Sequence, residues 1–217
     1  MFLGHYGLGL AAKKVAPRTS LGTLWLASLF LDLIWPIFLL AGIERVDIDP
    51  GNTRVTPLDF VSYPFSHSLL AVFGWALLLA GIYWMARRYG SGTAIVGLLV
   101  LSHWVLDALV HRPDLPLYPG SSRMAGLGLW NSWRETLLLE GVIFVWGWAV
   151  YRRATRPRDA VGTYAFRTLM FFLALVYIGS LVGPVPPSGR FVAIMALGQW
   201  LIVLWAYWVD RHREAVP

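Results

Sequence analysis

Long apolar runs are the feature that most constrains how this chain folds. Six segments with few charges, at 21–43, 67–86, 92–110, 136–151, 169–185 and 191–209, approach the length of about 20 residues that crosses a bilayer as a helix. With 57% hydrophobic and 14% charged residues, the 217-residue chain is too apolar for a soluble domain. The sequence predicts an all-α, polytopic membrane protein with six transmembrane helices in a single domain, 1–217.

The basic residues are distributed along the chain in a topological pattern. Twelve of the 18 Lys and Arg residues lie in the N-terminal stretch, in alternate loops and at the C-terminus. The positive-inside rule therefore predicts an inner (plasma) membrane protein of bacterial type, with both termini cytoplasmic and loops 44–66 and 112–134 outside. Aromatic residues do not interleave with the basic ones as they do in nucleic-acid sites, so we expect no nucleic-acid partner.

The N-terminal segment 1–12 is apolar and precedes Lys13 and Lys14, which is the reverse of the order in a signal peptide. At about 1.5 Å of rise per helical residue, it is too short to cross a bilayer. We therefore expect a retained half-helix, either re-entrant or interfacial.

A stripe of ionisable residues marks the third apolar segment. His103, Asp107 and His111 recur at steps of four, which places them on one face of a helix. The chain has no cysteine, so a metal site has to use histidine and carboxylate ligands. His103 and Asp107 are close enough to share an ion, whereas His111 lies farther along the helix. His111 is expected to serve a second metal or the substrate, or else to interact with the helix C-terminus.

Two further candidate residues lie in the first and second apolar segments, at a predicted membrane depth comparable to that of the stripe in the third segment. Asp32 is an acid in the middle of an apolar run, where an unpaired charge is costly, so we expect it to have a partner. The alternative is an aspartate bonded to polar groups of neighbouring helices. His67 follows Ser66, a residue type that often precedes the first turn of a helix. Alone, His67 reads as an interfacial histidine, but its predicted depth matches that of Asp107.

A third group of candidate residues lies at the beginning of the fourth apolar segment. Asn131 and Glu135 share a helical face, which fits a second metal or a substrate contact. Ser132 and Glu135 also have the spacing of a capping box. Both interpretations remain open, and Glu140, deeper in the same segment, has no assigned partner. Because acids and histidines concentrate in 1–135, this part is predicted to hold the metal site, with 152–217 as scaffold helices.

Several short blocks together resemble the YdjM-like family of inner-membrane, metal-dependent hydrolases. The blocks lie within residues 1–120 and are Gly4-His5, Asp32 followed by Pro36, Ser66-His67-Ser68-Leu69-Leu70-Ala71-Val72-Phe73, and Leu101-Ser102-His103 through Asp107 to Leu115-Pro116-Leu117. The resemblance implies that His5, Asp32, His67, His103 and Asp107 are metal ligands or a base beside the metal. It extends remotely to the zinc-dependent phospholipase C and P1 nuclease group, whose His-x-x-x-Glu pattern is Asn131-x-x-x-Glu135 here.

The leading functional hypothesis is a metal-dependent hydrolase. His67, His103 and Asp107 are expected to hold a divalent ion, zinc in the first place and manganese as the alternative. Asp32 then completes the ligand set or deprotonates the attacking water. The predicted depth favours a phosphoester or lipid-linked substrate at the outer leaflet. A permease or a carrier of metal ions or protons is the alternative, and a structural protein without catalysis is the third hypothesis.

Overall fold

The structure is a computed structural model that describes residues 1–216. In chain order, the helices are α1 (Leu3–Ala12), α2 (Leu21–Ser28), α3 (Phe30–Leu40), α4 (Leu69–Arg87), α5 (Gly90–Val110), the 3-10 helix η1 (Leu129–Asn131), α6 (Trp133–Ala154), α7 (Ala160–Val182), α8 (Gly189–Ala196) and α9 (Gln199–Arg211). Three antiparallel pairs of short strands complete it: β1 (Arg45–Ile48) with β2 (Leu58–Ser62), β3 (Leu115–Pro116) with β4 (Met124–Ala125), and β5 (Thr155–Pro157) with β6 (Arg213–Ala215).

The number of transmembrane helices differs from the prediction of six. Four helical segments are long and apolar enough to cross a membrane: α4, α5, α7, and α8 with α9 as one segment over Gly189–Arg211. The bent pair of α2 and α3 makes a fifth if it is counted as one span. The predicted span 136–151 falls within α6, whose 22 residues include five charged side chains. The mostly helical membrane class is therefore right, and six spans is wrong.

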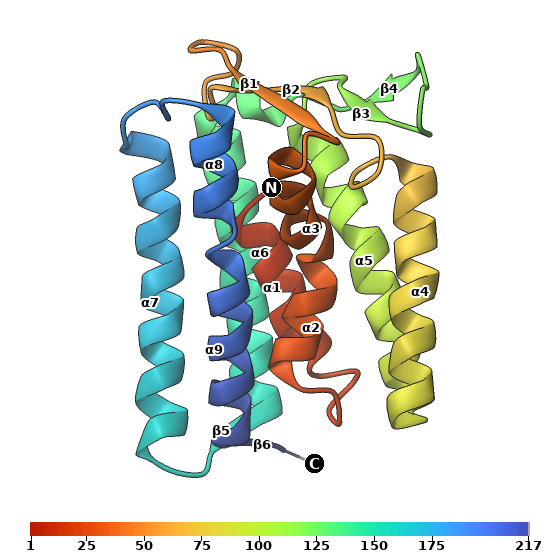
Figure 1. Ribbon diagram of the computed structural model, residues 1–217. Coiled ribbons are helices and arrows are strands. Elements are labelled where there is room, and N and C mark those ends of the chain that lie inside the picture. Colours follow the sequence, from red (N-terminus) through yellow and green to blue (C-terminus); the bar gives the residue numbers. More distant parts are fainter. Residues whose placement is uncertain (217) are drawn as a thin grey trace.

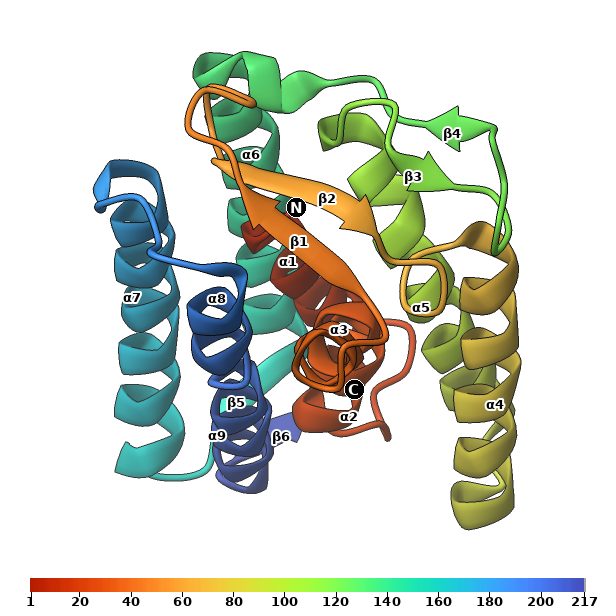
Figure 2. The ribbon, with the colours of Figure 1, turned by 45° about the horizontal axis from the view of Figure 1, so that its top comes forward.

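The helices run roughly side by side, with β1 to β4 at one end and β5 and β6 at the other (Figure 1). Figure 2 shows β1 and β2 crossing over the end of the bundle above α1 and α3. The arginines at the ends of α6 and α9 lie at the β5–β6 end, where Lys13 also contacts Asp210 of α9. Assignment of this basic end to the cytoplasm stays a prediction.

Helix α1 lies inside the bundle and not at its surface (Figures 1 and 2). It packs most extensively on α6, where Gly7 and Gly147 let the two backbones approach directly. Met1 is buried among the helices, whereas the C-terminal strand β6 lies at the far end of the bundle. The half-helix therefore has the expected length and lies within the bundle, and the placement of both termini in the cytoplasm stays a prediction.

The first long apolar segment is broken between α2 and α3. The two helices meet at 57°, and the break falls at Leu29, which has φ −108° and ψ 3°. Pro36 lies within α3, beyond the break. The break interrupts the helical hydrogen bonds and brings Ser28 and Asp32 toward α5.

Candidate metal centre

Helix α5 supplies two adjacent side chains to the candidate site. His103 and Asp107 are one turn apart, and both are buried. His103 Nε2 lies 3.1 Å from Asp107 Oδ2. The pair predicted from the four-residue spacing is therefore in direct contact.

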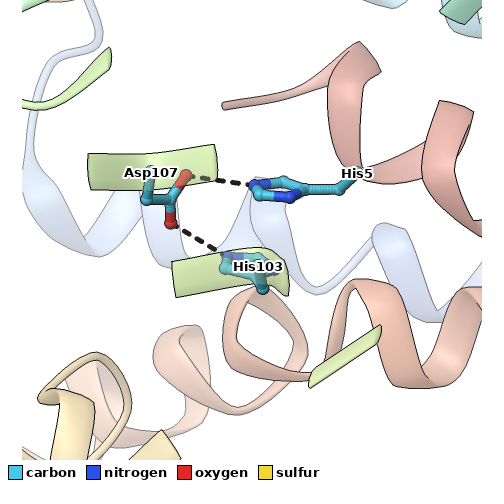
Figure 3. A group of neighbouring side chains, drawn as sticks. All are labelled: His5, His103 and Asp107. Atoms are coloured by element: carbon cyan, nitrogen blue, oxygen red, sulfur yellow. Dashed lines mark hydrogen bonds and ion pairs between the residues drawn. The ribbon is translucent and has the colours of Figure 1, made fainter. Parts of the chain in front are cut away.

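Three more of the predicted residues reach this pair from other elements. His5 comes from α1, Asp32 from the first turn of α3, and His67 from the segment just before α4. His5 Nε2 lies 3.1 Å from Asp107 Oδ1 (Figure 3). His67 Nε2 lies 3.7 Å from Asp32 Oδ1 and 3.8 Å from Asp107 Oδ2. We call these five residues, His5, Asp32, His67, His103 and Asp107, the His–Asp cluster.

The ring of His103 is oriented by a backbone group. Its Nδ1 lies 2.8 Å from the carbonyl oxygen of Ser28, at the break between α2 and α3. A carbonyl only accepts hydrogen bonds, so Nδ1 has to carry a proton and donate it. In the neutral imidazole, Nε2 is then an unprotonated nitrogen that faces Asp107 and Asp32.

His67 is oriented by a relay that the sequence did not reveal. Ser66 Oγ donates to Glu44 Oε2 at 2.6 Å, so it accepts the hydrogen bond from His67 Nδ1, 2.7 Å away. Glu44 is itself buried and held by the backbone N–H groups of Phe65 and Ser66. The relay leaves Nε2 of a neutral His67 unprotonated on the side of the two aspartates. Such outer carboxylates are common behind metal-binding histidines.

The donor atoms of the His–Asp cluster fit a divalent metal ion. Two groups, His5 with His103 and Asp107, and Asp32 with His67 and His103, each offer three ligand atoms within 4.8 Å of one another. Unprotonated Nε2 atoms and carboxylate oxygens repel one another unless a cation or a proton lies between them. The two carboxylates carry two negative charges; the Met1 amino group contacts Asp107, whereas among the described residues Asp32 pairs only with histidines. His103 belongs to both groups, so they form one continuous set of donors.

Glu140 of α6 holds the beginning of α1. Its Oε2 accepts the backbone N–H groups of Phe2 at 2.8 Å and Gly4 at 3.4 Å, and the amino group of Met1 contacts Asp107. A carboxylate at a helix N-terminus binds free N–H groups and favours the helix dipole. Glu140, which had no assigned partner in the sequence, therefore positions α1 and with it His5.

His111 lies beside the His–Asp cluster, in a separate polar group. Its Nδ1 is 3.0 Å from Asp114 Oδ1, which also accepts a hydrogen bond from the Tyr63 hydroxyl at 2.8 Å. Burial, together with the charge of Asp114, raises the pKa of Tyr63 well above its usual value, so this hydroxyl stays protonated and donates. His111 and Asp107 both line the same cavity, and a role of His111 toward substrate stays a prediction.

Asn131 and Glu135 are not brought to the His–Asp cluster. Both residues are exposed, and Asn131 closes η1 before α6 begins. Ser132 Oγ accepts the backbone N–H of Glu135 at 3.5 Å, as a helix cap does. The geometry therefore favours capping over a second metal at this position.

A cavity of about 210 Å³ adjoins the His–Asp cluster. Asp32, His67 and Asp107 line it, together with Leu58 and Phe60 of β2. Among the described residues, no Lys or Arg lines it. The sequence had assigned 152–217 to scaffold, yet side chains from α7 and α9 reach this cavity: Tyr177, Ser180, Leu181 and Gln199.

Several polar atoms on this cavity lack hydrogen-bond partners within residues 1–216. They are the Tyr177 hydroxyl, Gln199 Oε1 and Trp35 Nε1, all buried. A buried polar group without a partner is costly, and at the wall of a cavity a ligand or water can satisfy it. In the sequence, Tyr177 and Gln199 could be recognised only as polar residues inside apolar segments. The sequence did not show which way their side chains face.

Comparison with family models identifies a match over most of the chain. A family model described as YdjM inner membrane protein matches residues 1–185. The match extends beyond the blocks within residues 1–120 that carried the resemblance, through α6 and α7. No curated protein and no solved structure matches the chain.

Proposed function

Because the chain belongs to the YdjM inner membrane protein family, we propose that it is a membrane-embedded, metal-dependent hydrolase with its metal on the His–Asp cluster. One observation carries the proposal: Nε2 of His67 and Nε2 of His103 both face Asp32, each at 3.7 Å, while their Nδ1 atoms donate to acceptors behind them. Imidazole and carboxylate donors without thiolate favour zinc, with manganese as the alternative.

The two aspartates differ in accessibility, which separates their proposed roles. The Asp107 side chain is 2% exposed and contacts His5 and His103, as a ligand does. The Asp32 side chain is 24% exposed and faces the cavity. A divalent ion held by the His–Asp cluster would supply a Lewis acid and lower the pKa of a water beside it. Asp32 would take up the proton of a water in the cavity.

The cavity wall points to the substrate class. Apart from the ionisable residues Asp32, His67, Asp107, His111 and Glu140, its side chains are mainly apolar and aromatic, with the neutral hydrogen-bonding groups of Tyr177, Ser180 and Gln199. Such a wall suits the apolar part of a lipid better than a freely soluble, highly charged molecule. We therefore propose a lipid or lipid-linked ester, including a phosphoester, as the substrate class. The predicted orientation places the cavity at the outer leaflet.

The Asp32→Asn variant tests the proposed chemistry. The full-length protein, purified in detergent and loaded with zinc, is assayed with bis(4-nitrophenyl) phosphate and with a fluorogenic phospholipid. Because the amide cannot take up the proton, we expect hydrolysis to fall by about 10²–10⁴-fold, with more than half of the metal retained. His212→Gln changes the one histidine outside the first 111 residues and serves as the control. Undiminished hydrolysis in Asp32→Asn, or in metal-stripped wild type, would overturn the proposal.

A metal-ion or proton carrier is the second candidate. The break between α2 and α3 lies directly behind the His–Asp cluster, and discontinuous helices are typical of ion sites in transporters. Reconstituted liposomes separate the two functions. Zinc or proton flux that depends on Asp32, without cleavage of either ester, establishes the carrier and excludes the hydrolase.

A further inference from the structure

A second polar pocket lies at the opposite end of the bundle from the His–Asp cluster. It has a volume of about 340 Å³ and is formed by the end of α6, β5, the beginning of α7 and β6. Four arginines line it, Arg152, Arg156, Arg167 and Arg213. Among the described residues, no carboxylate lines this pocket, which we call the arginine pocket.

Arg213 is the arginine of this pocket whose side chain is buried and held in place by hydrogen bonds. It is 8% exposed, and its guanidinium donates to Thr155 Oγ1 at 2.9 Å and to the Gly162 carbonyl at 2.8 Å. The rings of Tyr151 and Phe166 lie 5.4 Å and 4.8 Å from its Cζ. These partners are all neutral, and within residues 1–216 Arg213 forms no ion pair with a carboxylate. A buried cation without a counter-charge is costly, so the pocket favours an anion.

The other arginines add charge that is mostly unneutralised. Arg156 pairs with Glu214, Nε to Oε1, at 2.6 Å, but Arg152 and Arg167 have no ion pair in the part of the chain that the structure describes. The buried indole Nε1 of Trp148, on the same wall, also lacks an acceptor within residues 1–216. Guanidinium groups recognise phosphate oxygens with paired, charge-assisted hydrogen bonds.

The surroundings of the arginine pocket distinguish a lipid from a soluble anion. Phe171 lies one helical turn beyond Arg167 on α7 and is 65% exposed; Val145 lies two turns before Arg152 on α6 and is 58% exposed. Both are exposed apolar side chains on the helices that carry Arg167 and Arg152, on the side of the pocket toward the middle of the bundle. We propose that the arginine pocket binds the phosphate group of an anionic phospholipid, whose acyl chains lie along these side chains.

Lipid binding to the purified full-length protein tests this site. Native mass spectrometry counts phosphatidylglycerol and phosphatidylcholine retained from mixed micelles. The double variant Arg152→Gln/Arg167→Gln removes two exposed charges and leaves Arg213 in place. The matched control, Arg87→Gln/Arg88→Gln, removes two exposed charges at the end of α4, outside the arginine pocket.

We expect wild type and the control to retain phosphatidylglycerol in preference to phosphatidylcholine. The pocket variant should bind it about tenfold more weakly, the scale of one lost charge-assisted hydrogen bond. An equal loss in both double variants would show diffuse attraction and overturn the proposal. Inorganic phosphate that stabilises the lipid-free protein as much as phosphatidylglycerol does would contradict the assignment to a lipid.

Discussion

The Ser28 carbonyl lies 2.8 Å from His103 Nδ1 and so directs the opposite ring nitrogen, Nε2, toward Asp107 and Asp32. The contact joins the broken helix pair of α2 and α3 to α5. It links the fold directly to the chemistry of the site, because the break exposes an acceptor that selects the tautomer suited to binding a metal.

Removal of His103 should abolish metal binding. His103 belongs to both three-residue groups of donors, so His103→Ala leaves neither group complete. We expect wild type to retain near-stoichiometric zinc or manganese after purification and this variant to lose it, as measured by inductively coupled plasma mass spectrometry. The control His212→Gln, which alters a histidine paired with Asp159 at the other end of the chain, should keep its metal. Wild-type protein that is metal-free after loading and desalting would exclude a metal site.

Ser66→Ala should weaken metal binding without removing a ligand. The change breaks the relay from Glu44 to His67, so the ring of His67 loses its orientation. Loss of such an outer partner typically lowers metal affinity by about 10–100-fold, which competition with a chelator measures. Ser102→Ala is the control, because Ser102 also precedes a cluster histidine but donates to the Leu99 carbonyl of its own helix. Equal affinities of the Ser66 and Ser102 variants would contradict the relay.

Gly147→Ala should separate α1 from α6. An added Cβ at Gly147 meets the backbone of Gly7, which cannot move aside by rotating a side chain. We expect a loss of about 1–3 kcal/mol in the free energy of unfolding, together with weaker metal binding because α1 carries His5. Gly141→Ala on the same helix has open space around it and should be neutral or stabilising by up to about 1 kcal/mol. Chemical unfolding in detergent, followed by tryptophan fluorescence, compares the two.

The Asp159–His212 pair should make stability depend on pH at the acid end. The contact between His212 Nδ1 and Asp159 Oδ2, 2.6 Å long, and the N–H of Gly162 lower the pKa of Asp159. A carboxyl whose pKa is lower in the folded state stabilises the fold above its unfolded pKa, about 3.9. This stabilisation is lost as the pH falls through the lower, folded value.

Asp159→Asn keeps the helix cap and removes the charge. It should therefore unfold more readily than wild type above about pH 4 and converge with it in stronger acid. Thermal unfolding across pH 2–7 measures the difference, with 0.15 M salt added in a parallel series because the pair is exposed. A difference that persists unchanged into strong acid would show that charge is not its cause.

Local periodicity was sufficient to predict part of the site. A step of four on a helix requires His103 and Asp107 to be neighbours, and the structure has them 3.1 Å apart. The capping-box spacing of Ser132 and Glu135 offered a cap for α6 as one of two interpretations, and the structure shows Ser132 in that role. The prediction of six transmembrane spans was too high. The length of an apolar run shows neither that α6 carries too many charges to count as a span nor that α2 and α3 meet at a bend.

The sequence by itself determined that this protein is a helical membrane protein, that any metal would take histidine and carboxylate ligands, and which two ligands share α5. Those properties depend on composition and on contacts within a few residues. Only the tertiary structure decided that His5 reaches Asp107, 102 positions away, that Glu140 holds the start of α1, and that Tyr177 and Gln199 face the cavity. The reason is physical: such contacts depend on how helices bend and pack, as at Leu29 and between Gly7 and Gly147, and periodicity within one segment carries no information about its neighbours.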